Sequence, residues 1–450
     1  MRLDYFRQPY ENSSILNFPE PETMQNSKST PLPLLGVKVV ELSHLIAGPY
    51  CCQMLADEGA TVIKVEPPGG ELTRHREPRR ETKEGSVTAY YASLNRDKQS
   101  VVLDLKNSEG LAIMDKLLET AEVFVTNMRA AALDRLGLHP KALHKRFPKM
   151  IIVSISGFGM DNAGEYADRA GLAIVAEAMS GATGLTRDHS GNPVWCGFAL
   201  GDITASVSAH AAIILALRNQ ERYGMGKLID LALVECMLPM TSVAMGRVQV
   251  ELSDTKAFVG SNKFHGIPYG AFPASDGAVN IGCNRDDFWV RLCVAMGQPE
   301  LGSDPRYATY SERSKRQREV HGITEEFTRR HTRAEITEKL VAQDVPVASI
   351  LGMDEVISNN YLLERGALWE VDDGFGGTFT LPANTAWFEK PDHTPRIPRL
   401  GEHCHAVVCD YLGVTEDEYA RLQKAGAFGS AQPRVSVQRP VTSAVSASLD

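Results

Sequence analysis

Short β-branched runs alternate with helical segments from residue 37 to residue 235, and this alternation constrains the fold more than any other feature. Strand-like runs occupy 37–42, 61–66, 101–105, 123–127, 150–159 and 228–235. Helical patterns occupy 47–59, a segment from Ser108 onward, 131–145 and 203–220. Strands and helices that alternate at this spacing form βαβ units around a mostly parallel sheet covered on both faces. We therefore expect an α/β fold with a Rossmann-like large domain.

The pattern changes after residue 237. Residues 266–282 alternate like a β-hairpin, with Asp276-Gly277 as its turn. Charged helical segments follow at 311–330 and 332–343, then a strand-turn-strand segment at 367–388 and a helical region at 400–425. This part predicts a second, smaller α+β domain.

Composition excludes several classes of protein. The chain has 450 residues, 43% of them hydrophobic, and a net charge of −9, which argues against a nucleic-acid binder. No apolar run approaches the roughly 18 residues that cross a bilayer, and residues 1–30 lack the hydrophobic region of a secretory signal. We expect a cytoplasmic protein that does not enter a membrane.

The cysteines do not form a recognisable framework. Eight are spread along the chain without a CxxC pair, as in a protein from a reducing compartment. The run His403-Cys404-His405, with Cys409, could hold zinc or could pack as an amphipathic helix. A tetrahedral zinc site usually brings a second ligand pair, so we favour packing and expect no metal.

Familiar nucleotide and hydrolase motifs are absent. The sequence has no GxGxxG after its first strand and no GxxxxGK[ST], HExxH or GxSxG. A nicotinamide dehydrogenase, a P-loop NTPase, a zinc hydrolase and an α/β-hydrolase are disfavoured. Any ligand must then be held at the carboxyl ends of the strands by other means.

Basic residues follow several predicted strands. They are Arg74, Arg76, Arg79 and Arg80 after the second strand, Lys106 after the third, and Arg129 after the fourth. Guanidinium and ammonium groups placed together in this way suit a pyrophosphate or phosphate ligand. The alternative is a solvated loop at 74–80.

Asp202 is the most suggestive acid. It stands at a Gly-Asp step that opens the long apolar helix at 203–220. It could be the N-cap of that helix, because Asp accepts hydrogen bonds from the first backbone amides. It could also be a carboxylate held ionised at a helix start, as a carboxylate nucleophile requires.

Several segments in this order resemble the family III CoA-transferases. They are LLGVKVVELSHLIAGPYCCQMLADEGATVIKVEPPGG, VVLDLKNSEG, VTNMRAAALDRLGL, IIVSISGFG, ALGDITASVSAHAAIILAL and GMGKLIDLALVE, and the similarity spans about residues 34–425. The resemblance implies that Asp202 corresponds to the catalytic aspartate and that His44 lies at an active-site position. It implies further that the adenine nucleotide of CoA is contacted by Leu103, Lys106, Asn127, Met128 and Arg135.

The chain departs from the family pattern at several positions. Ile46 stands where oxalate-specific members carry a glutamine that touches the substrate, which puts oxalate in doubt. Pro67 stands where they carry an arginine beside the nucleotide, and Arg74 or Arg76 could compensate. The glycine-rich loop expected over the active site has only weak candidates, in Gly260 and Gly266.

The resemblance also covers α-methylacyl-CoA racemases, which move a proton. These carry a Gly-His-Asp step where this chain has Gly171-Leu172-Ala173. Because no acid or histidine stands there, the sequence favours transfer over racemisation.

The resemblance implies transfer of CoA from an acyl-CoA, such as succinyl-CoA or acetyl-CoA, to a free carboxylic acid. The route is an aspartyl anhydride and an aspartyl-CoA thioester, with no tightly bound cofactor. His44 and Arg169 could receive the second carboxylate of a dicarboxylate. The alternatives are a racemase-like enzyme and a non-catalytic partner subunit of a heteromeric transferase.

The resemblance further implies an interlocked, ring-like homodimer, with a large domain built from both ends of the chain. We expect a flexible extension over 1–33, the large CoA-binding domain over 34–236, the small domain with its linkers over 237–350, a C-terminal part that returns to the large domain over 351–428, and a disordered tail over 429–450.

Overall fold

A six-stranded parallel sheet forms the centre of the larger domain. The computed structural model describes residues 32–167, 169–188, 191–250, 266–386 and 391–429. The predicted extension and tail lie almost wholly outside these ranges. The strands are β1 (Lys38–Leu42), β2 (Thr61–Glu66), β5 (Gln99–Val102), β6 (Val123–Thr126), β7 (Ile151–Ser156) and β8 (Lys227–Ala232). Their order is β5-β2-β1-β6-β7-β8, the Rossmann-like order in which the chain moves outward from β1 in both directions.

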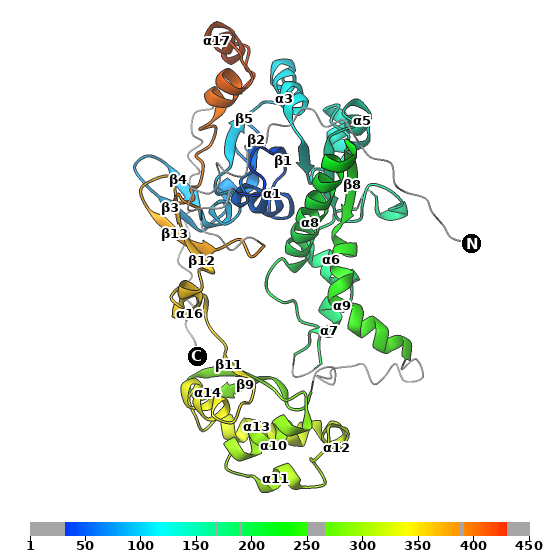
Figure 1. The fold of residues 1–450 in the computed structure, drawn as a ribbon, viewed down its shortest axis with the longest axis vertical. Coiled ribbons are helices and arrows are strands. Elements are labelled where there is room, and N and C mark those ends of the chain that lie inside the picture. The colour runs from blue at the N-terminus through cyan, green and yellow to red at the C-terminus, as the bar shows by residue number, and fades with distance from the viewer. Residues whose placement is uncertain (1–31, 168, 189–190, 251–265, 387–390, 430–450) are drawn as a thin grey trace, which may run out of the picture.

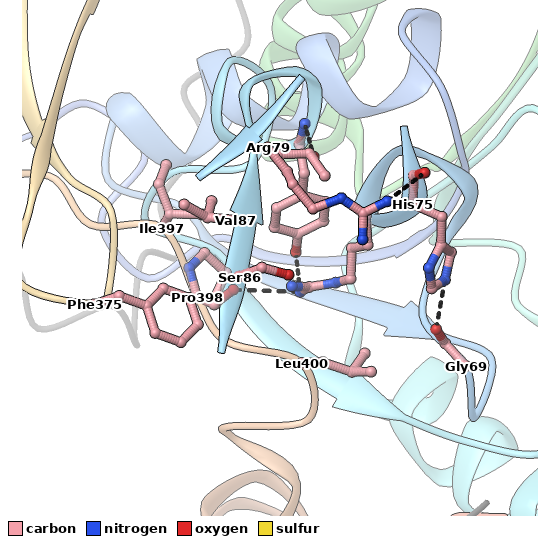
Figure 2. A pocket seen from close by; sticks show the side chains of 12 residues that line it. Gly69, His75, Arg79, Ser86, Val87, Phe375, Ile397, Pro398 and Leu400 are labelled. Carbon is pink, nitrogen blue, oxygen red and sulfur yellow. Dashed lines mark hydrogen bonds between the residues drawn. The ribbon is translucent and has the colours of Figure 1, made fainter. Parts of the chain in front are cut away.

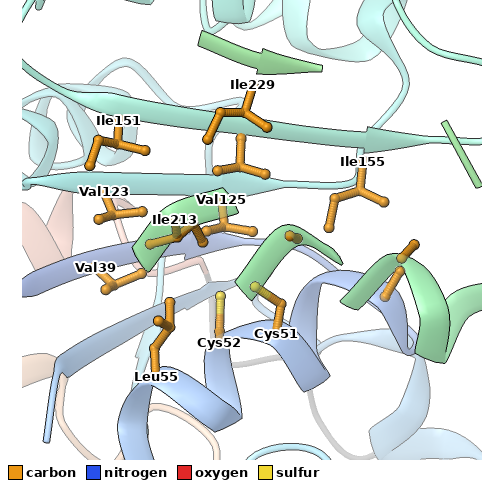
Figure 3. Close-up of a cluster of buried hydrophobic side chains, with 14 of the residues drawn as sticks. Val39, Cys51, Cys52, Leu55, Val123, Val125, Ile151, Ile155, Ile213 and Ile229 are labelled. Carbon is orange, nitrogen blue, oxygen red and sulfur yellow. The ribbon is translucent and has the colours of Figure 1, made fainter. Parts of the chain in front are cut away.

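Helices cover both faces of this sheet because alternate strand residues are apolar on both sides. On one face, Val39, Val123 and Ile151 pack against α1 (Ala47–Asp57) and α8 (Leu200–Tyr223), as Figure 3 shows. On the other face, Val40, Phe124 and Ile152 pack against α3 (Ser108–Thr120) and the C-terminal segment. The predicted α/β class and parallel sheet are confirmed.

Several predicted element boundaries are wrong. The helix expected at 131–145 is two helices, α4 (Ala130–Arg135) and α5 (Pro140–Arg146), because Gly137 adopts φ +70° and Pro140 starts a new helix. The strand expected at 228–235 ends at Ala232, where α9 (Leu233–Val250) begins. The helix expected at 311–330 is also two, α12 (Tyr310–Lys315) and α13 (Gln317–Thr328).

The smaller domain is built around the predicted hairpin. Strands β9 (Tyr269–Ala274) and β10 (Gly277–Gly282) pair antiparallel, and β11 (Val347–Ser349) pairs with β10. The apolar face of this sheet packs against α10 (Asp286–Ala295), α13 and α14 (Arg333–Val341) around Trp289, Val320 and Leu340. This domain has its own core, below the sheet domain in Figure 1.

The chain returns to the sheet domain after β11. It passes through α15 (Met353–Ile357) and α16 (Asn360–Glu364) to the hairpin of β12 (Leu368–Asp372) and β13 (Thr378–Pro382). In Figure 1 this return path lies on the opposite side from α9, by which the chain leaves. The hairpin shares a small core with a second hairpin, β3 (Arg79–Glu81) and β4 (Ser86–Thr88), and with α2 (Ala89–Ala92).

The C-terminal segment completes the large domain. The His403 amide donates to the Ser100 carbonyl, and the Val102 amide donates to the Cys404 sulfur, so the segment lies along the edge strand β5. A π-helical turn (Ala406–Tyr411) and α17 (Glu416–Lys424) then bury Val407, Val408 and Leu422 in the second core.

Among the described helices, α8 has the length and hydropathy of a membrane span, at 24 residues. The sequence had been expected to contain no such segment. The helix packs against α1, α9 and the sheet, and Ala205, Ala209 and Ile213 are completely buried there.

Candidate active site

The candidate site lies where the direction of the sheet connections reverses. Strands β1 and β6 are neighbours, and the chain moves away from them to opposite edges. The carboxyl ends of such a pair leave a crevice in which α/β proteins bind ligands. His44 follows β1, and Asn127 follows β6.

The Asn127 amide joins these two loops. Its oxygen accepts from the His44 amide nitrogen at 3.0 Å, and its nitrogen donates to the His44 carbonyl at 2.7 Å. The next residue, Leu45, has φ +63°, a conformation that a branched side chain rarely adopts. Its amide donates to the buried Glu71 carboxylate. Asn127 and Glu71 therefore hold a strained turn that carries His44 and Ile46.

Asp202 approaches the same place from α8. The Ser206 hydroxyl, one turn further along, donates at 2.8 Å to the carbonyl of Ala47, the first residue of α1. The starts of α1 and α8 are therefore adjacent, and α1 begins directly after the His44 turn. At the start of α8 the Leu200 amide donates to the Phe198 carbonyl and the Gly201 amide donates to the Glu177 carboxylate. The donors left at these helix starts within the described residues are the amides of Asp202 on α8 and of Ala47 and Gly48 on α1.

Asp202 is not the N-cap of its helix. Ala199 occupies that position, and no side chain caps it. Asp202 is the third helical residue, and its carboxylate makes no hydrogen bond or ion pair with the described part of the chain. The N-cap alternative is therefore wrong, and the half-buried carboxylate has no partner among the described residues.

The surroundings of Asp202 raise the pKa of its carboxyl group above the ordinary value. Burial, and then the charge of Glu177, raise the pKa of Asp202 to about 6. Tyr90, on α2, faces the same carboxylate: burial and then the Asp202 charge raise the pKa of its phenol.

Glu177 and Tyr90 were not predicted from the sequence. Glu177 lies on α6 (Ala173–Met179) and is 1% exposed. Its carboxylate accepts from the Gly201 amide at 3.1 Å and from the Trp195 indole at 2.6 Å. The two helices meet so closely that a Cβ on Gly201 would lie 3.0 Å from the Ala173 Cα. Ala173, which lies in the segment compared above with the racemases, therefore borders the Asp202 turn.

The surroundings of His44 disfavour its charged form. Burial lowers its pKa, and Glu71 only partly opposes this. Ile46 is the N-cap residue of α1 and is half-buried beside it.

The residues assigned to the nucleotide lie along the carboxyl edge of the sheet. Leu103 follows β5, but its side chain is buried in the second core, so only its backbone could face a ligand. Lys106 and Arg135 are exposed, and Met128 is half-buried against the same core.

The two arginines proposed to compensate at Pro67 differ. The Arg74 guanidinium binds Glu66 at 2.7 and 2.8 Å, the Tyr91 hydroxyl and the Pro398 carbonyl. The Arg76 side chain is exposed, and its guanidinium makes no hydrogen bond or ion pair within the described ranges. Its charge lowers the pKa of Tyr90 against the dominant effect of burial, which places it on the Tyr90 side of the site.

A separate cavity of about 350 Å³ lies behind the Arg74 guanidinium. His75, Arg79 and Pro398 contribute to its lining, and His75 bonds the Gly69 carbonyl across one end (Figure 2). Asp202 and His44 are not among the lining residues. Arg169 lies apart from it, exposed, stacked on Tyr166 and 3.9 Å from Glu165.

The histidine and cysteine run divides between two surroundings. His403 and Cys404 bond the backbone of β5, as packing predicts. His405, Cys409 and Glu416 place donor atoms within 4.8 Å of one another, but His405 already bonds both Glu416 oxygens. Of the loop candidates, Gly260 lies outside the described residues. Gly266 lies in the small domain against the Cys283 carbonyl.

Known proteins with similar sequences and structures agree with this architecture. The model of CoA-transferase family III matches residues 34–404. A succinyl-CoA–D-citramalate CoA-transferase from Chloroflexus aurantiacus is 33% identical over 88% of this chain and 98% of its own. The alpha subunit of a succinyl-CoA–L-malate CoA-transferase from that organism is 29% identical over 90% and 94%. A CaiB/BaiF family protein from Brucella suis superposes with a TM-score of 0.74 at 30% identity, covering 85% of this chain and 100% of that one.

The family model matches most of the sequence, and the parallel sheet has the Rossmann-like strand order, so the chain belongs to CoA-transferase family III.

Proposed function

We propose that this enzyme transfers CoA through a covalent intermediate on Asp202. The observation that carries this proposal is the half-buried Asp202 carboxylate, which has no partner in the described structure and lies where the starts of α1 and α8 meet. A carboxylate left without a cation at a ligand crevice is suited to attack an acyl carbon.

The reaction proceeds by carboxylate attack on a thioester. An Asp202 oxygen attacks the carbonyl of the acyl-CoA, the carbon–sulfur bond breaks, and an acyl-aspartyl anhydride and CoA thiolate result. The thiolate attacks the Asp202 carbonyl, giving an aspartyl-CoA thioester and the donor acid. The acceptor carboxylate attacks that thioester, and the released thiolate attacks the acceptor carbonyl of the new anhydride, which returns Asp202 as a carboxylate.

The helix starts supply the electrostatics. Each tetrahedral intermediate carries an oxyanion, and backbone amides at the starts of α1 and α8 are the donors available to it. The side chain of Asp202 is half-buried, which limits access of water to a hydrolysable anhydride.

The CoA nucleotide is proposed to lie along the carboxyl edge of the sheet. Lys106, Arg135 and the exposed Arg76 supply cations, with the Leu103 backbone, Asn127 and Met128 between them. Arg74 would act indirectly, because its guanidinium is bonded to Glu66.

We propose a dicarboxylic acid as acceptor and succinyl-CoA or acetyl-CoA as donor. The citramalate and malate in the relatives' names are dicarboxylates, and His44 and Arg169 are the groups proposed for the second carboxylate. Ile46, in place of a polar side chain, argues against oxalate.

We further propose an interlocked homodimer in the cytoplasm. The interlocked form is the one that the family resemblance implies, and α9 and the return path through α15 and α16 lie on opposite sides of the molecule in Figure 1. Exposed apolar residues on α8 and α9, among them Leu215, Met240 and Val243, provide area for such a partner.

Intact mass after incubation with succinyl-CoA, with and without hydroxylamine, tests the proposal. A hydroxylamine-sensitive adduct on Asp202 is the expected result. If no adduct forms but α-deuterium exchanges in a branched acyl-CoA, the enzyme is a racemase. If transfer requires an added homologous subunit, the chain is a partner subunit.

A further inference from the structure

Glu177 lies at the junction between the candidate nucleophile and a segment that precedes it in the chain. One oxygen accepts from the amide of Gly201, the residue directly before Asp202. The other accepts from the indole of Trp195, which is 45% exposed. Two parts of the molecule, the first turn of α8 and the segment ending at Trp195, are therefore joined by one carboxylate.

A carboxylate in this place needs an explanation. Glu177 is 1% exposed, and within the described ranges no lysine, arginine or histidine pairs with it. Burying a charge without a cation is costly. Both partners are N–H donors, so an acceptor-only group satisfies them, whereas a glutamine would offer its own N–H to one of them.

We propose that Glu177 is a positioning residue for the transfer reaction, holding the Asp202 turn and Trp195 in one geometry. This inference rests on the proposed function of Asp202. It adds a second acid whose role is to place the nucleophile and act on it through its charge.

The groups around Asp202 make the effect of that charge measurable. On α6 the facing group is Glu177, and on α2 it is Tyr90, which lies in the fields of Arg76 and Glu71. The neighbouring contacts of α8 with α1 and α9 are neutral, namely the Ala47 carbonyl and the Met237 thioether.

These groups determine the direction in which the pKa of Asp202 shifts. Burial and Glu177 raise the pKa of Asp202 to about 6, so the ionised nucleophile accumulates as pH rises through that value. Removing the Glu177 charge lowers the pKa of Asp202, although burial still holds it above its ordinary value.

The experiment measures kcat/KM for CoA transfer from pH 4.5 to 8.5, after circular dichroism has shown that each variant is folded. Glu177→Gln should move the acid limb to lower pH and reduce the plateau by about 10- to 100-fold, because the Asp202 turn loses one anchor. Glu177→Asp keeps the charge, so its midpoint should stay near the wild-type value while its plateau falls.

Trp195→Phe provides a test that does not depend on folding of a buried variant. It removes a donor to Glu177 from a half-exposed position, leaves the negative charge less neutralised, and should move the midpoint to higher pH. Glu58→Gln is the matched control, since Glu58 is a buried carboxylate that bonds α8 at His210, two turns from Asp202. Its midpoint should equal that of wild type.

The outcomes separate the two proposals. If Asp202→Asn, assayed in parallel, still transfers CoA, the proposed function fails. If Asp202→Asn is inactive but neither the Trp195→Phe nor any folded Glu177 variant changes midpoint or plateau, the inference about Glu177 is overturned.

Discussion

Two groups of acids in the sheet domain, Glu41 with its lysines and Asp202 with Glu177, have opposite surroundings. At the ends of β1 and β2, Glu41 lies 2.7 Å from Lys64 and 2.8 Å from Lys98, all completely buried. Burial opposes ionisation of Glu41, but the two lysines prevail and lower its pKa to about 2. At the start of α8, Asp202 and Glu177 lack cations within the described chain, and the pKa of Asp202 is raised.

The difference separates a structural acid from a reactive one. A carboxylate bound by two ammonium groups is stable as an anion and cannot attack a substrate without breaking those bonds. A carboxylate with no partner destabilises the folded state but remains free for chemistry. Removing one charged side chain should therefore lower the free energy of unfolding in the first region and raise it in the second.

The largest effect is expected at Asp202. Asp202→Asn should reduce CoA transfer by at least about 10⁴-fold, because the nucleophile is lost. The same change should raise the free energy of unfolding at pH 8 by about 1 kcal/mol, since it removes a half-buried unpaired charge. Chemical denaturation and a transfer assay measure both.

Asp230→Asn is the control for that comparison. Asp230 caps the loop after β7 by accepting from the Met160 and Asp161 amides, so this variant should lose stability and keep activity. Near-wild-type turnover by Asp202→Asn would contradict the assignment of Asp202 as the reactive acid.

The second effect is a loss of stability at the lysine cluster. Lys64→Met should cost about 3 kcal/mol of unfolding free energy in urea, because one partner of a buried carboxylate is removed. The exposed Lys227→Met, at the start of β8, should change it by less than about 0.5 kcal/mol. Equal losses in both variants would contradict a special role for the cluster.

The Glu41 pKa gives this cluster a pH signature. The folded-state pKa of Glu41, about 2, lies below its unfolded value near 4.5. The stability that the ionised Glu41 contributes is therefore fully present above about pH 4.5. Wild-type stability should therefore fall as pH drops from about 4.5 toward 2, and in Lys64→Met this pH dependence should be weaker.

An intermediate effect is expected where the two loops meet. Asn127→Ala removes both bonds to His44 and should lower kcat/KM by about 10- to 100-fold through misplacement. Asn384→Ala, which removes a buried asparagine from the Glu58 region, should reduce thermal stability without this loss. Equal catalytic losses would show that Asn127 acts only through the fold.

The smallest effect compares the two arginines after β2. Arg76→Gln should raise KM for acyl-CoA by about fivefold, as for loss of one exposed cation, with no change in melting temperature. Arg74→Gln should lower the melting temperature, because the buried Glu66 loses its bidentate partner. Reversed results would assign Arg74 to the ligand.

Periodicity was sufficient for the sheet but not for the site. The β-branched runs at β1, β2 and β6 were predicted correctly because their pattern is local. Asp202 was singled out by its place before an apolar helix, but its catalytic role rests on the family resemblance and stays a prediction. Gly137 and Pro140 signal a helix break in the sequence, yet a single helix was predicted across them at 131–145. Glu177 and Tyr90 had no local signal, because their relation to Asp202 arises only when α6, α2 and α8 pack together.

The position of the C-terminal segment along β5 has a consequence during synthesis. The ribosome releases β1, β2, β5 and α3 early, yet the C-terminal residues from His403 to Ala427, which complete the cover of the second face and lie along the β5 edge, emerge nearly last. Until then the nascent chain presents an open strand edge and apolar surface, which favour aggregation. The sheet domain can therefore finish folding only after the small domain has been synthesised. The domain whose synthesis begins first is completed last.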